Sequence, residues 1–165
     1  MVLTETKAKS VRVNRSWLQL LRKKYTVFQS LVPSSEHSKA GVLVAVAKPL
    51  TELGTIRQEF PPQGVQGYLL HVVIETPESN PLHIAGAYCP PQSKDQGLRK
   101  TIYTECEKIL AGTPATHCTT IVAGDFNATI QNADRYGTID RCEAMDSIHR
   151  QFLTRAKLLF GVSKL

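Results

Sequence analysis

The sequence has few features of a membrane or secreted protein. None of its apolar runs reaches the roughly 18 residues that a membrane-spanning helix requires. The first residues, MVLTETKAKSVRV, contain no apolar core of a signal peptide. The four cysteines form no CxxC pair and lack zinc-site spacing: Cys89, Cys106, Cys118 and Cys142. We therefore expect an intracellular protein, cytoplasmic or nuclear, with mostly buried, reduced thiols, although disulfides remain an alternative.

Acidic residues are absent between Lys7 and Lys24, where the chain has seven basic residues. Residues 1–60 contain ten Lys and Arg against four Asp and Glu, and residues 61–165 contain ten of each, so the net charge of +6 arises in the first part. Such a segment attracts phosphate-rich partners such as DNA. The alternative is a solvated helix face that only improves solubility.

The sequence contains no internal repeat and no low-complexity segment, and its length and 42% hydrophobic content are typical of one domain, residues 1–165. Apolar runs predict strands at 2–5, 25–31, 40–47, 67–75, 82–89 and 119–123. Helices are expected at 14–24, from a Ser93 cap to a stop at Gly112, and at 142–158. This alternation favours an α/β sandwich with mixed sheets.

The strand at 119–123 runs directly into Gly124-Asp125-Phe126-Asn127. Residues two apart on a strand point the same way, so we expect Asp125 and Asn127 to project together while Phe126 packs inward. Gly124 would allow a tight turn. An aspartate can orient or deprotonate a water, and an asparagine amide can donate to a phosphate oxygen. The alternative is a turn in which both side chains bond the local backbone.

Attack on a phosphodiester also needs a positive charge, usually Mg²⁺, with Mn²⁺ as the other candidate, held by one or two carboxylates. Glu5 follows the short strand at the start of the chain and is the expected ligand. Tyr88 ends another strand, and its hydroxyl could reach a phosphate. In the simpler alternatives, Glu5 is a surface acid and Tyr88 is a core tyrosine.

Four segments in order carry a family resemblance: VLTETK, AGVLVAV, LHIAGAYCPP and IVAGDFNA. Together they resemble the endonuclease/exonuclease/phosphatase superfamily, which includes the DNase I-like nucleases. Within it they are most similar to the endonucleases of non-LTR retrotransposons and to apurinic/apyrimidinic endonucleases. The resemblance spans nearly the whole chain and implies a DNase I-like four-layer α/β sandwich, incomplete at both ends.

The resemblance implies a role for each of four residues. Glu5 would bind Mg²⁺, Tyr88 would position the phosphate, Asp125 would activate the water, and Asn127 would contact the phosphate. The family's first strand would precede Met1, and its Ser-Asp-His block would follow Leu165. His149 lies on a helical segment and does not replace the family's histidine, while His71 and His83 are interpreted as core or sheet-face residues.

These patterns together predict a Mg²⁺-dependent DNA phosphodiesterase that nicks one strand, with weak or no activity because charge-stabilising groups are absent. The absent strands would also leave sheet edges and apolar faces exposed. One alternative is an inositol or other small-molecule phosphatase of the same superfamily. The other is a non-catalytic nucleic-acid-binding relic of a polyprotein that carries a reverse transcriptase.

Overall fold

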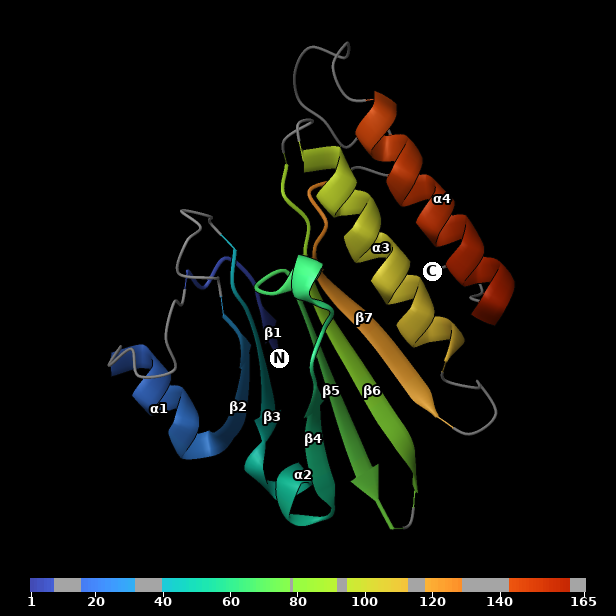
Figure 1. The fold of residues 1–165 in the computed structure, drawn as a ribbon. Helices are drawn as coiled ribbons and strands as arrows, with labels where there is room; N and C mark the ends of the chain where they lie inside the picture. Colours follow the sequence, from blue (N-terminus) through green and yellow to red (C-terminus); the bar gives the residue numbers. More distant parts are fainter. Residues whose placement is uncertain are drawn as a thin grey trace.

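The computed structural model describes residues 1–7, 16–31, 40–77, 79–91, 95–112, 118–128 and 143–160. Within these residues the strands form two sheets, and helices lie on the outer face of each (Figure 1). The order of layers is α1, the smaller sheet, the larger sheet, and then α3 with α4. The predicted four-layer α/β sandwich is confirmed.

The smaller sheet is antiparallel, in the order β1–β3–β2, and consists of β1 (Val2–Leu3), β2 (Tyr25–Ser30) and β3 (Val42–Ala47). The larger sheet is mixed, in the order β4–β5–β6–β7, and consists of β4 (Thr55–Glu59), β5 (Leu69–Thr76), β6 (Ser79–Tyr88) and β7 (Thr119–Asp125). Only β6 and β7 are parallel among the described pairs, because α3 provides the crossover between them.

The core lies between the two sheets. Val42 and Val44 of β3 and Leu70 and Val72 of β5 are fully buried there. The sheets approach so closely at Gly86 that an added Cβ would lie 2.9 Å from a methyl carbon of Val42. Burial of branched side chains on both inner faces is the main driving force for this arrangement.

The helices α1, α3 and α4 pack through apolar side chains. In α1 (Ser16–Lys24), Leu18 is buried against Leu43 and Ala45 of the smaller sheet. In α3 (Gln96–Ala111), Ile102, Cys106 and Leu110 are buried toward the larger sheet, and α4 (Glu143–Phe160) packs against α3. No helix of the described residues is both long and apolar enough to cross a membrane.

Several predicted boundaries are wrong. The helix α3 begins at Gln96 after Asp95, so it starts later than a Ser93 cap implies, and Ser93 itself lies outside the described residues. It ends at Gly112 as predicted. The strand β6 begins at Ser79, three residues earlier than predicted, and Ser79 pairs with Thr76 of β5. Pairing with β7 begins only at Leu82, so Pro81 lies where this edge of β6 is unpaired. Three short elements were not predicted: α2 (Lys48–Glu52), β4 and the 3₁₀ turn η1 (Gln63–Val65).

Candidate active site

The parallel register of β6 and β7 brings two predicted site residues side by side. Tyr88 pairs with Asp125, and Ala87 pairs with Gly124 immediately before them. Gly124 has a φ of 152°, and an added Cβ would lie 1.8 Å from the carbonyl oxygen of Ala87. Glycine is therefore required here for the close approach of the two strands and not for the predicted turn. The strand also continues to Asp125, two residues beyond its predicted end at Ala123.

Glu5 reaches the same place from the opposite sheet. The hydroxyl of Tyr88 donates to Oε1 of Glu5 at 2.7 Å, although 83 residues separate them. Tyr88 is 2% exposed, whereas Glu5 is exposed. Burial, and after it the hydrogen bond to Glu5, raises the pKa of Tyr88 above its usual value. The hydroxyl therefore remains a proton donor throughout the physiological pH range.

The position of Asn127 differs from the prediction. It lies beyond the end of β7 with a φ of 44°, so the alternation of a strand does not apply to it. Its backbone N–H donates to Oδ1 of Asp125 at 2.9 Å, and its side-chain amide donates to the carbonyl of Cys89 at 2.8 Å. The local turn that was the alternative interpretation is thus present, and it ties Asp125 to the segment after β6.

Phe126 packs inward as predicted. Its ring lies 5.7 Å from that of Tyr103, 5.5 Å from that of His149 and 6.1 Å from that of Phe152, between centroids. We call these four side chains the aromatic cluster. His149 is buried in it and bonds the hydroxyl of Tyr103 at 2.9 Å. This histidine is therefore a core residue of the helical layer, in agreement with its exclusion from the site.

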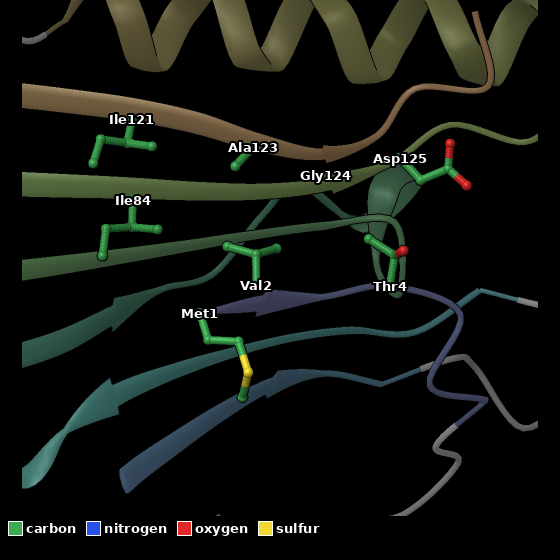
Figure 2. A pocket seen from close by; sticks show the side chains of 8 residues that line it. All are labelled: Met1, Val2, Thr4, Ile84, Ile121, Ala123, Gly124 and Asp125. Carbon is green, nitrogen blue, oxygen red and sulfur yellow. The ribbon is translucent and has the colours of Figure 1, made fainter.

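An apolar groove opens next to Asp125 on the face of β7 that points toward β1 (Figure 2). Its volume is about 500 Å³, and the larger sheet contributes Ile84, Ile121, Ala123, Gly124 and Asp125. Met1, Val2 and Thr4 line the opposite side. Ile121 is 46% exposed, so β7 is a partly uncovered edge strand and not the core strand that its sequence indicates.

Comparison of the sequence with protein-family models and with curated proteins finds no match. Solved structures do match. The AP endonuclease LMAP from Leishmania major aligns with a TM-score of 0.65 and 16% identity, over 99% of this chain and 61% of that chain. Truncated Caenorhabditis elegans TDP2 aligns with a TM-score of 0.52 and 13% identity, over 84% and 52% of the two chains. Humanized D. rerio TDP2 gives 0.54 and 15%, over 81% and 53%.

The chain has the DNase I-like fold, which it shares with these structures. At these identities the likeness concerns the fold, and it confirms the fold that the four sequence segments predicted. The chain spans 61% of the length of the AP endonuclease and about half the length of the TDP2 chains.

Within this DNase I-like fold, the site has the donor atoms that Mg²⁺ prefers. Glu5 and Asp125 are both exposed carboxylates, and Tyr88 lies between them through its bond to Glu5 and its pairing with Asp125. Mg²⁺ is commonly held by one or two carboxylates and several waters. The described residues contain no group of three or more His, Cys, Asp or Glu side chains that could hold a metal ion.

Arg99 was not predicted as a site residue, but it holds the segment that follows β6. Its side chain is fully buried, and Nη1 donates to the carbonyl of Pro90 at 2.6 Å. Pro90 follows Cys89, whose carbonyl accepts the amide of Asn127. Burial raises the pKa of Cys89 to about 12, so its thiol is not a nucleophile. The sequence offered one indication of this buried role: Arg99 precedes the apolar residues Ile102 and Cys106 on the same helix.

The described basic residues at the end of α1 lie away from the site. Arg22, Lys23 and Lys24 form the last turn of α1, next to the start of β2. The far end of β2, at Ser30, bonds Gly67 near the site, so the strand's length of about 20 Å separates the basic turn from it. Lys7 lies at the site end, whereas Lys9, Arg12 and Arg15 fall outside the described residues.

Proposed function

We propose that this protein is a Mg²⁺-dependent phosphodiesterase of the DNA endonuclease type, which nicks one strand and leaves a 3′-hydroxyl. One observation carries the proposal: Glu5, Tyr88 and Asp125, which come from three distant parts of the chain, meet at one end of the sandwich. The fold shared with an AP endonuclease supports DNA as the substrate. The resemblance of the four segments to the endonucleases of non-LTR retrotransposons extends the proposal to a polyprotein with a reverse transcriptase and to an intracellular location, nuclear or cytoplasmic.

The side chains have complementary chemistry for this reaction. Asp125 is exposed and can accept a proton from an attacking water. Tyr88 is a neutral donor, and Asn127 keeps a second amide N–H besides the one that bonds Cys89. Glu5, with Asp125, would hold Mg²⁺, which when bound supplies positive charge to the phosphodiester oxygens.

We expect the activity to be weak. Among the described residues, the histidines lie away from Asp125: His149 is buried in the aromatic cluster, and His71 and His83 bond each other on β5 and β6. Loss of one charge-stabilising group from such a site typically reduces the rate about 10²–10³-fold.

A second candidate function is nucleic-acid binding without catalysis. The observation that favours it is that the hydroxyl of Tyr88 is already bonded to Glu5 and the amide of Asn127 to Cys89. A phosphate must displace or share these partners. Binding without catalysis predicts a complex with DNA whose affinity falls steeply with added salt, as for any phosphate contact, and no strand cleavage.

Nicking of supercoiled plasmid tests the enzyme proposal. With Mg²⁺, we expect the wild type to form nicked circles above the level seen with EDTA, and Asp125→Ala to reduce the rate about 100-fold or more. Leu53→Ala is the matched control, because Leu53 is 63% exposed and precedes β4 at the end of the sandwich opposite to Asp125. Equal background nicking by the wild type and Asp125→Ala would leave nucleic-acid binding as the function.

A further inference from the structure

A second hollow lies at the other edge of the sandwich, between the ends of β2 and β4. Its volume is about 410 Å³. Three glutamines, Gln29, Gln58 and Gln66, line it with Ser30, Phe60 and Pro61. We call it the amide pocket. It is separate from the apolar groove beside Asp125, and the proposed catalytic residues do not line it.

The lining of the amide pocket is uncharged but rich in hydrogen-bonding groups. Oε1 of Gln29 is buried and has no hydrogen-bond partner. The amide nitrogen of Gln58 makes only a long contact, 3.5 Å, to the backbone carbonyl of Gln29. Buried polar atoms normally have partners, so Gln29 keeps an unused acceptor, which a turn of its side chain into the pocket would present to a donor on a ligand.

Phe60 adds an aromatic surface at the rim. It is 86% exposed, which is unusual for a phenylalanine. A flat ligand that offers amino and carbonyl groups at its edge and an aromatic face matches this combination. Nucleobases have these properties: glutamine amides pair with their edges, and aromatic side chains stack on their faces.

The amide pocket and the candidate active site belong to the same end of the molecule. β4 ends at Glu59, opposite His71 near the start of β5, and Tyr88 at the end of β6 bonds the backbone of Tyr68 just before β5. All these strand ends therefore meet at one end of the larger sheet.

A continuous set of hydrogen bonds connects the two places. The N–H of Thr6, next to Glu5, donates to the carbonyl of Gly41, whose own N–H donates to Gly67. The N–H of Gly67 donates to Oγ of Ser30 in the amide pocket at 2.8 Å. Lys7, bonded to Ala40 beside this path, is exposed and adds a positive charge between the two places.

The separation suits a nucleic-acid strand. Asp125 is on β7 and Gln58 is on β4, the two outer strands of the four-stranded sheet. Gln58 pairs with Val72, Val72 with Ile84 and Ile84 with Ile121, so Asp125 lies three strands away and four residues further along β7. Three intervals of about 4.8 Å between strands and four residues of about 3.3 Å along a strand give a separation of about 20 Å. Since successive nucleotides of one DNA strand are about 3.4 Å apart along the helix axis, this distance corresponds to about six nucleotides.

We propose that the amide pocket binds an unpaired nucleobase of the DNA strand whose phosphate lies at Asp125. Phe60 stacks on the base, and the glutamine amides bond its edge. A base in a duplex has its pairing edge occupied by its partner, so the protein would favour DNA with an unpaired or displaced base about six nucleotides from the reacting phosphate. This inference rests on the proposed DNA substrate and names the form of DNA that the site prefers.

Equilibrium binding in EDTA tests the proposal without any need for catalysis. Fluorescence anisotropy would compare two labelled hairpins of the same length and charge, both closed by the same linker without bases: one with a single unpaired base in its stem, the other with a fully paired stem. We expect the wild type to bind the first more tightly. Phe60→Ala should weaken binding of that hairpin at least about 5-fold, the lower limit for loss of one base–aromatic stack, and leave the paired hairpin unchanged. Phe60→Trp should retain the preference.

Leu53→Ala is again the matched control, since it removes an exposed apolar side chain outside the pocket. Circular dichroism would verify that each variant is folded, and the exposure of Phe60 makes unfolding by its truncation unexpected. If Phe60→Ala binds both hairpins as Leu53→Ala does, the nucleobase site is wrong. If the wild type binds neither hairpin, the DNA substrate is wrong as well. If the preference exists but plasmid nicking fails, the nucleobase site holds and the proposed catalysis falls.

Discussion

The hydroxyl of Tyr88 and the carboxylate of Glu5 hold each other in place at the candidate active site. The bond costs little entropy for Tyr88, because its ring is buried and stacked near that of Tyr68, 6.3 Å away. Glu5 is exposed, so its position depends on this one partner far more than that of Tyr88 does. A phosphate that accepts a hydrogen bond from Tyr88 would compete with Glu5, and this competition would slow the proposed reaction.

A second side-chain pair, His71 and His83, lies on neighbouring strands β5 and β6. Nε2 of His71 and Nδ1 of His83 are 3.1 Å apart, so one ring donates and the other accepts. Burial, then the charge of His83, then that of Arg57 lowers the pKa of His71 to about 4. Burial, and after it the charge of Arg57, lowers the pKa of His83, while the charge of Glu75 opposes this shift. Both rings are therefore neutral at pH 7 in the folded protein.

This pair predicts a loss of stability in mild acid. Because the folded pKa of His71 lies below the unfolded value of 6.5, the unfolded state takes up the proton first, and stability falls as the pH falls from 6.5 to about 4. Because the ring is partly exposed, solvent weakens this effect, and we expect the free energy of unfolding to fall by about 1–2 kcal/mol. Urea unfolding at pH 7.5 and 4.5 would measure it. His71→Gln, which cannot titrate, should show a smaller loss, and an equal loss in both proteins would contradict the assignment.

At the scale of elements, the sequence predicts best where burial is uniform. The strands β3 and β5 carry runs of apolar residues that are buried on both faces, and both were predicted. The strand β4, with the sequence TIRQE, lies at the sheet edge, where Arg57 forms ion pairs with Glu59 and Glu75. A polar edge strand of this kind is stabilised by pairing with β5 and not by its own apolar pattern, so the sequence alone does not indicate it.

The site could be predicted only in part for a related reason. Strand ends followed by polar residues indicated Glu5, Tyr88 and Asp125, and the structure brings them together. The Tyr88–Glu5 hydrogen bond depends on how the two sheets stack, which no local pattern specifies. The left-handed backbone of Asn127 likewise follows from its bonds to Asp125 and Cys89.

Phe126 links the candidate site to the helical layer, so it should matter for stability. Phe126→Ala removes its contacts with Tyr103, His149 and Phe152. We expect the free energy of unfolding to fall by about 2–4 kcal/mol, as for truncation of a packed aromatic residue. Phe60→Ala is the matched control and should change stability by less than about 0.5 kcal/mol, because Phe60 is 86% exposed. Chemical denaturation of both variants would measure this difference, and equal stabilities would contradict the packing role of Phe126.

At the scale of the whole molecule, the two sheets cover each other unevenly. β3 packs over β5 and β6, but β1, which faces β7, has only two residues against seven in β7. In the described part of the chain, the face of β7 toward the smaller sheet is therefore partly uncovered, and the apolar groove marks the gap (Figure 2). Ile121 and Ile84 line this groove, so they belong to an apolar sheet face of the kind that was predicted to be exposed.

This groove predicts that the folded protein binds apolar dyes. Native protein at neutral pH should enhance the fluorescence of anilinonaphthalene sulfonate, because an apolar groove of about 500 Å³ is open to solvent. Ile121→Gln should reduce the enhancement several-fold and leave the free energy of unfolding within about 0.5 kcal/mol, since the side chain is half exposed. Leu53→Gln makes the same chemical change outside the groove and should leave the enhancement unaltered. Equal dye binding by the two variants would show that the dye reports another surface, and that the groove is closed in solution.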